Sequence, residues 1–361
     1  MKLVNVRKTN KAIFLILFIC SCLLVTTSLY NKIKMIKSVD GIQKILVGFI
    51  IPEASLIKIR NAYDKKMDYW FKERNDIDMQ ENDIKEENDK NEEEKPRNIN
   101  GKYRIIERHL TGRGIHYENF YVNNKSDIEL DVGKYLNRQL SLKFDKNDLP
   151  KVLIVHTHTS ESFMKEDKEY YDENFYPRSQ NEEENVIKVG NSIENKLKEN
   201  KINVIHSKNY HDYPSYNGSY LRSAGTIKEN INNYPSIQIV LDIHRDSMGN
   251  NETGKIKPVF NINGRKAAQI MIMTGCDSDK SLNFPNWEHN LSLGLKLQRK
   301  VEKMYPGMTR PMYFGNVKYN MHLTKGSLLI EVGTDANSMD EVSYTGELLG
   351  NALASLIKEL E

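Results

Sequence analysis

Two histidines and a glutamate follow an apolar segment near the middle of the chain. In KVLIVHTHTSES, His156 and His158 are two residues apart, and Glu161 comes three residues after His158. Side chains two apart on a strand project from the same face, so both histidines would share a face if the strand continues that far. A histidine and a carboxylate this close in a turn can both bind one Zn²⁺.

Two later apolar segments end in residues of the same kinds. IVLDIHRDS carries His244, and SLLIEVG carries Glu331 two residues before Gly333, which suits a tight exit into a loop. A catalytic zinc takes three protein ligands, often two histidines and a carboxylate, and leaves one position for water. A second carboxylate, which is not a ligand, takes the proton of that water and passes it to the leaving amine. Two histidines and two glutamates at three strand ends satisfy this requirement.

Each candidate also has an ordinary structural role. A single histidine is more often a hydrogen-bonded structural residue than a metal ligand, and an acidic residue at a strand end is often a cap or a surface charge. Glu183 belongs to an acidic trio, residues 182–184, that precedes an apolar helix and would stabilise its N-terminus. His322, in KYNMHLTKGS, comes just before the Glu331 strand and could donate a hydrogen bond to a developing oxyanion.

From about residue 150 onward, short β-rich segments alternate with helical patterns. This alternation predicts an α/β domain with a mixed or mostly parallel central sheet flanked by helices. In such sheets, sites gather beyond the C-terminal ends of the strands, where the candidate residues lie. The expected strands are 151–156, 202–206, 237–244, 258–263, 268–274 and 327–332, and the expected helices are 185–199, 218–233, 287–304 and 338–358.

The N-terminal part of the chain has a different character. Residues 12–29 are apolar and uncharged, just long enough to cross a bilayer. Basic residues before this segment place the N-terminus in the cytoplasm and the rest of the chain outside. The alternatives to a retained anchor are a cleaved signal peptide and a lipid-modified Cys22.

The composition divides the chain into four expected parts. The segment 76–98 is heavily acidic and almost without apolar residues, which predicts a disordered tether. The parts are a cytoplasmic tip and transmembrane anchor over 1–35, a juxtamembrane segment and acidic linker over 36–98, a lead-in segment over 99–147 and a catalytic domain over 148–361.

Charge and cysteine content exclude several classes of function. A net charge of +3 over 361 residues gives no general case for nucleic-acid binding. Cys20 and Cys22 lie in the apolar run and Cys276 stands alone, which fits neither a disulfide framework nor a cysteine-based zinc site. If a metal is bound, histidines and carboxylates must supply the ligands.

Four segments, HTHTSESF, LDIHRDS, YNMHLTKGS and LLIEVG, follow one another in this order after the apolar N-terminal run. As a set they resemble the stage II sporulation protein P family over roughly residues 148–361. The resemblance implies a zinc N-acetylmuramoyl-L-alanine amidase that also has endopeptidase activity and acts on peptidoglycan during engulfment of the forespore. It also implies a site in the intermembrane space of the sporulating cell, and stage II sporulation proteins D and M as partners.

Taken together, the residues and the resemblance predict amide hydrolysis in peptidoglycan. Glu183 competes with Glu161 because its surroundings look like the E-x-N-V ligand stretch of some zinc amidases, whereas His158 and Glu161 have the H-x-x-E spacing of zinc carboxypeptidases. Glu331 is the predicted general base and then general acid. The predicted Zn²⁺ ligands are His158 (or His156), Glu161 (or Glu183) and His244.

Arg245 or His322 is the expected stabiliser of the tetrahedral oxyanion. One alternative to the amidase is another cell-surface zinc enzyme, a carboxypeptidase or deacetylase. Another is a non-catalytic module that binds or organises the cell wall. Free stem peptides released from an intact glycan would distinguish the amidase from the other zinc enzymes. Zinc content and turnover on purified sacculi would distinguish it from the non-catalytic module.

Overall fold

The structure, a computed structural model, describes residues 98, 99, 101–144 and 148–361. The predicted anchor at 12–29 and nearly all of the predicted linker lie outside these residues. Within the described ranges, no helix is both long enough and apolar enough to cross a membrane.

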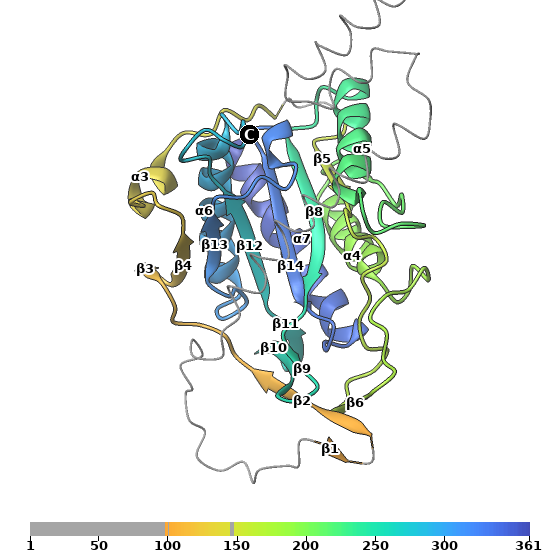
Figure 1. The fold of residues 1–361 in the computed structure, drawn as a ribbon. Coiled ribbons are helices and arrows are strands. Elements are labelled where there is room, and N and C mark those ends of the chain that lie inside the picture. The colour runs from red at the N-terminus through yellow and green to blue at the C-terminus, as the bar shows by residue number, and fades with distance from the viewer. Residues whose placement is uncertain (1–97, 100, 145–147) are drawn as a thin grey trace, which may run out of the picture. The chain divides into compact units, whose positions relative to one another are not determined.

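An eight-stranded mixed sheet forms the centre of the described chain (Figure 1). Four neighbouring strands, β14, β8, β5 and β7, run parallel to one another, whereas β12 is antiparallel to β14. The predicted mixed, mostly parallel sheet is therefore confirmed. In order across the sheet, the strands are β3 (Ile115–Tyr117), β4 (Phe120–Lys125), β13 (Met312–Gly315), β12 (Ile270–Gly275), β14 (Ser327–Thr334), β8 (Ile239–Asp246), β5 (Val152–Val155) and β7 (Val204–His206).

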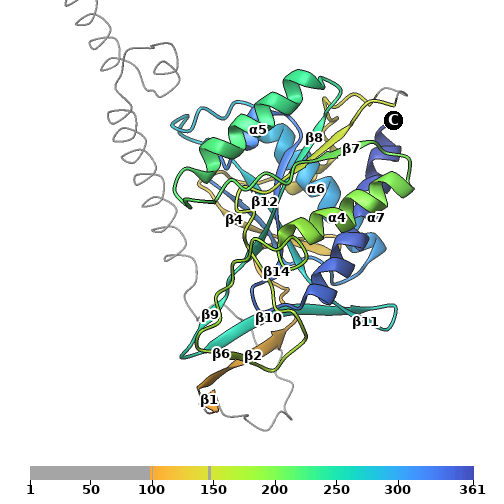
Figure 2. The ribbon, with the colours of Figure 1, turned by 90° about the vertical axis from the view of Figure 1, so that its right-hand side faces the viewer.

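Helices cover both faces of this sheet (Figure 2). Three helices, α4, α6 and α7, bury the larger apolar core on one face, and α5 and the 3-10 turn η3 cover the other. The short helix α3 packs on α6. The helical elements are α3 (Val132–Asn137), α4 (Val186–Glu199), α5 (Ser219–Asn233), α6 (Trp287–Met304), η3 (Met321–Leu323) and α7 (Met339–Leu360).

The alternation of side chains along β5 and β8 decides which residues face which layer. Ile154 packs into the core under α4, α6 and α7, whereas Val155 packs with Ile227 of α5. In β8, Ile243 belongs to the first core. Because successive residues of a strand point to opposite faces, His244 projects toward the α5 layer.

A second sheet lies at the C-terminal end of β8, which leads directly into β9 (Figure 1). Its longest strand, β10, pairs in parallel with β2 and antiparallel with β11. The strands are β1 (Asn98–Ile99), β2 (Lys102–Arg108), β6 (Tyr170–Asp172), β9 (Gly249–Asn250), β10 (Gly254–Ile262) and β11 (Arg265–Ala268).

The predicted elements of the C-terminal part are confirmed. The four expected helices correspond to α4, α5, α6 and α7, and the six expected strands to β5, β7, β8, β10, β12 and β14. Local capping fixes two of the helix starts: Asn185 caps α4, and Ser338 with Glu341 forms a capping box on α7. The lead-in segment contributes β3 and β4 to the main sheet and β2 to the second sheet, which the sequence analysis did not predict.

Candidate functional site

Two of the predicted site residues are neighbours across a parallel strand pair. His244 of β8 and Glu331 of β14 are partners in register, and residues in register on adjacent strands project from the same face. The register of β14 shifts just after Glu331, and Gly333 has a φ of 61°, which glycine adopts without strain. Both side chains therefore lie near the C-terminal ends of two central strands, on the face of the sheet that α5 covers.

Glu161 comes to the same place from the turn after β5. Its Oε2 lies 3.6 Å from Nδ1 of His244. Two ligands about 2.1 Å from one zinc at a tetrahedral angle are separated by about 3.4 Å, so this distance matches a pair of ligands. The ring of His158 stands edge-on to that of His244, with their centroids 5.3 Å apart.

His158 has a buried ring nitrogen that could bind a metal. The residue is buried, and its Nδ1 has no hydrogen-bond partner. Burial lowers the pKa of His158 to about 3, while Glu161 opposes that shift. The imidazole is therefore neutral at physiological pH, which is the form that binds a metal.

His244 lies between two carboxylates, those of Glu161 and Asp242. Burial alone would lower its pKa, but Asp242 and Glu161 raise that pKa well above the usual value. For Glu161, burial opposes ionisation, but His244 and Arg245 hold the pKa of the carboxyl well below its ordinary range. An imidazolium between two carboxylates thus occupies a position that also suits a divalent cation.

Asp242 is placed to orient His244. Its Oδ1 lies 3.0 Å from Nε2 of His244, although that nitrogen makes no aligned hydrogen bond. Thr157 fixes the carboxylate by donating from its backbone N–H to Oδ1 and from its hydroxyl to Oδ2. A carboxylate behind a ligating histidine is the usual outer partner in zinc sites, where it sets the ring's orientation and tautomer.

Glu331 differs from Glu161 in its surroundings. Its Oε2 is buried without a hydrogen-bond partner. Burial raises the pKa of Glu331 to about 8; His244 opposes the shift, and Asp246 and Glu161 add to it. A bound divalent cation would lower this value, which would bring the carboxyl into the range where it exchanges protons near neutral pH.

Aromatic side chains from the loop before α5 and from its first turn line the site. Tyr216 stacks on His158 with centroids 4.4 Å apart, and its hydroxyl lies 3.2 Å from Nε2 of that histidine. Tyr220 stands edge-on to His158 at 5.4 Å and stacks at 6.5 Å on His244. Burial raises the pKa of Tyr220 well above its usual value, so the phenol keeps its proton and can donate a hydrogen bond.

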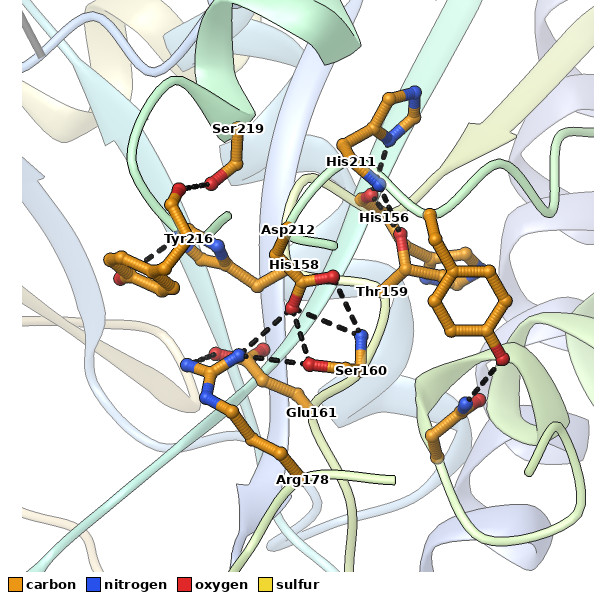
Figure 3. A network of polar contacts seen from close by, with 12 residues as sticks. His156, His158, Thr159, Ser160, Glu161, Arg178, His211, Asp212, Tyr216 and Ser219 are labelled. Atoms are coloured by element: carbon orange, nitrogen blue, oxygen red, sulfur yellow. Dashed lines mark hydrogen bonds and ion pairs between the residues drawn. The ribbon is translucent and has the colours of Figure 1, made fainter. Parts of the chain in front are cut away.

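Arg178 reaches the site from the loop before α4. Its guanidinium lies between Glu161 and the buried carboxylate of Asp212, which in turn accepts from the hydroxyl and backbone N–H of Ser160 (Figure 3). The guanidinium carbon lies 4.8 Å from the centre of the Tyr216 ring. A second cationic group is thus fixed beside the proposed ligand Glu161.

The family model described as stage II sporulation protein P matches residues 27–354. The chain belongs to this family. The stage II sporulation protein P of Bacillus subtilis (strain 168) is 26% identical over 277 residues, a match that spans 70% of this chain and 65% of that relative.

Solved structures of amidases are more distant from this family member. The N-acetylmuramoyl-L-alanine amidase AmiC2 of Nostoc punctiforme is 10% identical, with a TM-score of 0.33, over 60% of this chain and 98% of its own. The CwlD amidase of Clostridioides difficile, solved with the GerS lipoprotein, is 12% identical, with a TM-score of 0.34, over 58% and 98%.

His156, the alternative ligand to His158, lies outside the site. β5 ends at Val155, and His156 continues its alternation toward the α4 layer. Its Nδ1 contacts the carbonyl of Ile243 at 3.0 Å and its Nε2 contacts Nε2 of His206 at 2.8 Å, so both ring nitrogens are hydrogen-bonded. The expected shared face does not form, because the chain turns after residue 156 instead of continuing as a strand.

The structure also separates Glu183 from the site. Glu183 is exposed and forms an ion pair with Lys188. The neighbouring Asn185 caps α4 instead. Of the two carboxylates predicted to compete for the third ligand position, the structure brings only Glu161 to His244.

Arg245 holds the loop around the site rather than offering its side chain to it. The guanidinium donates to the carbonyls of Ser162, Pro177 and Asp246, while the backbone N–H donates to Oε2 of Glu161. This geometry does not favour the predicted contact with an oxyanion. The role of His322 stays a prediction: the residue lies on η3, and its buried Nδ1 has no hydrogen-bond partner.

Among the described residues, the ligand atoms of one group of three acidic side chains, Glu107, Asp167 and Glu341, all lie within 4.8 Å of one another, whereas those of His158, Glu161 and His244 do not. The ammonium of Lys257 already lies between them, 2.8 Å from Glu107, 3.1 Å from Glu341 and in contact with Asp167. Burial would lower the pKa of this lysine, but the three carboxylates raise it. The cluster is an ion-pair network, buried at Lys257 and Glu341 and exposed at Glu107 and Asp167, that joins the second sheet to the start of α7.

Four residues of the site were not predicted from the sequence. Asp242 is two residues before His244 on the same strand, so both side chains project from one face. This spacing could have identified Asp242 as a partner of His244. Tyr216 and Tyr220 belong to a tyrosine-rich stretch whose composition does not indicate which of its tyrosines line the site. Arg178 has no local signal, because its partner Asp212 is 34 residues away.

Proposed function

We propose that this protein is a zinc-dependent peptidoglycan hydrolase, more specifically an N-acetylmuramoyl-L-alanine amidase with endopeptidase activity. The observation that carries the proposal is one arrangement on the α5 face. There Glu161 Oε2 lies at ligand spacing from His244 Nδ1, beside the unpaired Nδ1 of His158 and next to the buried, unpaired Oε2 of Glu331. Membership in the stage II sporulation protein P family supports it further.

The residues present fit a zinc ion. His158, His244 and Glu161 supply two nitrogens and one oxygen, the donor set of many catalytic zinc sites. His158 is neutral and its free nitrogen is buried, which is costly unless a partner is provided. When bound, zinc would supply Lewis acidity toward the scissile carbonyl and toward water.

The chain's own residues account for the proton transfers. Glu331 would take a proton from the attacking water and donate it to the departing amine, as general base and then general acid. Its poorly solvated surroundings favour the protonated form that the second step requires. Tyr220, with its proton retained, and His322 are the candidates to hydrogen-bond the oxygen that becomes negative.

The remaining expectations join this proposal. The protein would be anchored by the segment 12–29 with its catalytic part outside the cytoplasmic membrane. It would act on the wall during forespore engulfment, with stage II sporulation proteins D and M as partners. Family membership and the sequence pattern are what support these expectations.

Metal analysis and product analysis on one preparation test the function. Purified protein should contain about one zinc per chain, and it should release free stem peptides from sacculi while leaving the glycan intact. A chelator should abolish the release, and added zinc should restore it. Shortened stems still attached to glycan would indicate a carboxypeptidase, loss of acetyl groups a deacetylase, and wall binding without turnover a non-catalytic module.

A further inference from the structure

We propose that Arg178 binds a carboxylate group of the substrate next to the scissile amide and thereby makes the enzyme selective for acidic stem peptides. This inference rests on the proposed function, because it assigns a substrate contact to the same site. It concerns a residue that is not a metal ligand and takes no part in the proton transfers.

One edge of the Arg178 guanidinium is available for a ligand. Nη1 donates to Oδ2 of Asp212 at 2.9 Å and to Oγ of Ser160 at 3.2 Å, which uses both of its protons. In the part of the chain that the structure describes, Nε and Nη2 make no hydrogen bond, and the nearest acidic atom to Nη2 is Oε1 of Glu161 at 3.9 Å. The Nε–Nη2 edge is a pair of parallel donors that matches the two oxygens of a carboxylate.

The guanidinium is also held in place before any ligand arrives. The side chain of Asp212 is fully buried, and Ser160 donates to it from both its backbone N–H and its hydroxyl. Tyr216 lies against the guanidinium, and the Arg178 side chain retains 25% of its exposure. A donor fixed by neighbours loses little conformational entropy when it binds.

The position of Arg178 relates the carboxylate to the reaction. Nη2 is 3.9 Å from a proposed zinc ligand, and one extended residue spans about 3.3–3.6 Å. A carboxylate on this edge would therefore belong to the first or second residue beyond the scissile bond. In a peptidoglycan stem, the second residue is a glutamate whose α-carboxylate is free or amidated, and the stem's C-terminus carries another carboxylate.

Recognition here would depend on hydrogen-bond geometry more than on net charge. Asp212 already balances the charge of Arg178, so the gain comes from two aligned bonds to an ionised acceptor. A carboxamide in the same position would direct an N–H₂ group at one of the arginine's donors. The difference between the two substrates should be about 10- to 100-fold.

A substrate-by-variant comparison tests the proposal. Two muropeptides that differ only in the glutamate carboxylate or carboxamide would be cleaved by wild type, Arg178→Lys and Arg178→Gln. We expect wild type to prefer the carboxylate about 10- to 100-fold in kcat/KM. Arg178→Gln should lose that preference, so that its ratio of kcat/KM for the two substrates falls to about one whatever its overall rate, and Arg178→Lys should be intermediate because an ammonium cannot form the paired contact.

A third muropeptide, with its C-terminal carboxylate converted to an amide, distinguishes the two sources. A preference that follows the terminal group supports the proposal with the peptide terminus as the ligand. Equal loss on all substrates would overturn it, because a residue that only holds the loop or stabilises the oxyanion cannot tell them apart. So would a wild type that shows no preference, even if the variants do not fold.

Failure of the proposed function remains distinguishable from failure of this inference. If wild type cleaves none of the muropeptides, calorimetric binding of the same set to the zinc-loaded protein still measures the preference for a carboxylate. Weaker binding of the carboxamide supports Arg178 as its receptor. Equal binding of both peptides contradicts it.

Discussion

His156 and His158 are two residues apart, yet they lie in opposite layers of the protein. His158 faces α5 with a buried nitrogen that has no partner. His156 faces α4, where both of its nitrogens are hydrogen-bonded and where a Cβ on Gly190 would lie 2.9 Å from its Nε2. A buried polar atom without a hydrogen bond needs a partner that the chain does not supply, and of these two histidines His158 has such an atom and His156 does not.

The two regions also distribute their protons differently. The carbonyl of Ile243 can only accept, so His156 donates from Nδ1 and accepts from His206 at Nε2. The other nitrogen of His206 faces Glu194 at 3.1 Å. Every ring nitrogen of His156 and His206 therefore has a polar partner within the protein. The group of His158, Glu161 and His244 differs, because Nδ1 of His158 has no hydrogen-bond partner. We infer a structural role for the His156 cluster and a catalytic one for the other.

Loss of a metal ligand should have the largest effect. We expect His158→Ala to lose both zinc and turnover, because a site with two remaining protein ligands does not retain an open-coordination zinc. His244→Ala should behave in the same way. Zinc content by atomic emission and stem-peptide release from sacculi would be measured on the same samples.

The matched control for that experiment is His156→Gln. It should keep zinc and retain turnover within several-fold, although its thermal stability should fall because a buried hydrogen-bond chain is broken. Zinc loss in His156→Gln together with zinc retention in His158→Ala would reverse our assignment of the two histidines.

Glu331→Gln should separate chemistry from metal binding. The amide keeps the shape of the side chain but cannot take a proton, so turnover should fall about 10²- to 10⁴-fold while zinc and wall binding remain. Stopped assays on sacculi, paired with metal analysis, give both values. If zinc disappears with activity, Glu331 is a ligand and its role exchanges with that of Glu161.

Asp242→Asn should give a smaller loss. Removing the charge behind His244 should weaken zinc binding about 10- to 100-fold, as other outer-partner substitutions do. Competition with a chromogenic chelator measures the affinity. Asp340→Asn, in an exposed pair with Arg265, is the control and should change nothing.

The sequence was sufficient to predict most of the main sheet and four residues of the site. Long amphipathic segments such as α4 and fully buried strands such as β8 have strong local patterns. Of the second sheet, β10 was predicted but its partners were not, because several of them are short and pair over long separations; β6, for example, has only three residues and joins β2. The sequence left open whether His156 and His158 share a face, because the end of β5 is set by the turn at residues 157–160, and no pattern within the strand predicts that turn.

Metal-free protein should show an opposite pH dependence of stability in the two regions. The folded-state pKa of Glu331 is about 8, against an ordinary value of 4.5. The folded chain therefore keeps a proton that the unfolded chain releases, and stability present below pH 4.5 is lost as the pH rises through 8. Glu331→Gln should remove this loss, as thermal melts in a chelator would show. A wild type and variant with parallel pH profiles would contradict the burial of the group.

The smallest expected effect concerns His156. Burial, with the neighbouring His206, lowers its pKa from 6.5 to about 3, so its contribution is present above pH 6.5 and lost as the pH falls toward 3. Melting temperatures of wild type and His156→Gln should therefore converge in acid. A gap between them that widens in acid would show that the imidazole is already charged in the folded protein.

The location of the metal tests the central claim most directly. An anomalous difference map from zinc-loaded crystals should show one peak bonded to His158, His244 and Glu161 at about 2.0–2.2 Å, with Glu331 outside bonding distance. A peak at His156 and His206, among Glu107, Asp167 and Glu341, or directly on Glu331 would contradict the account.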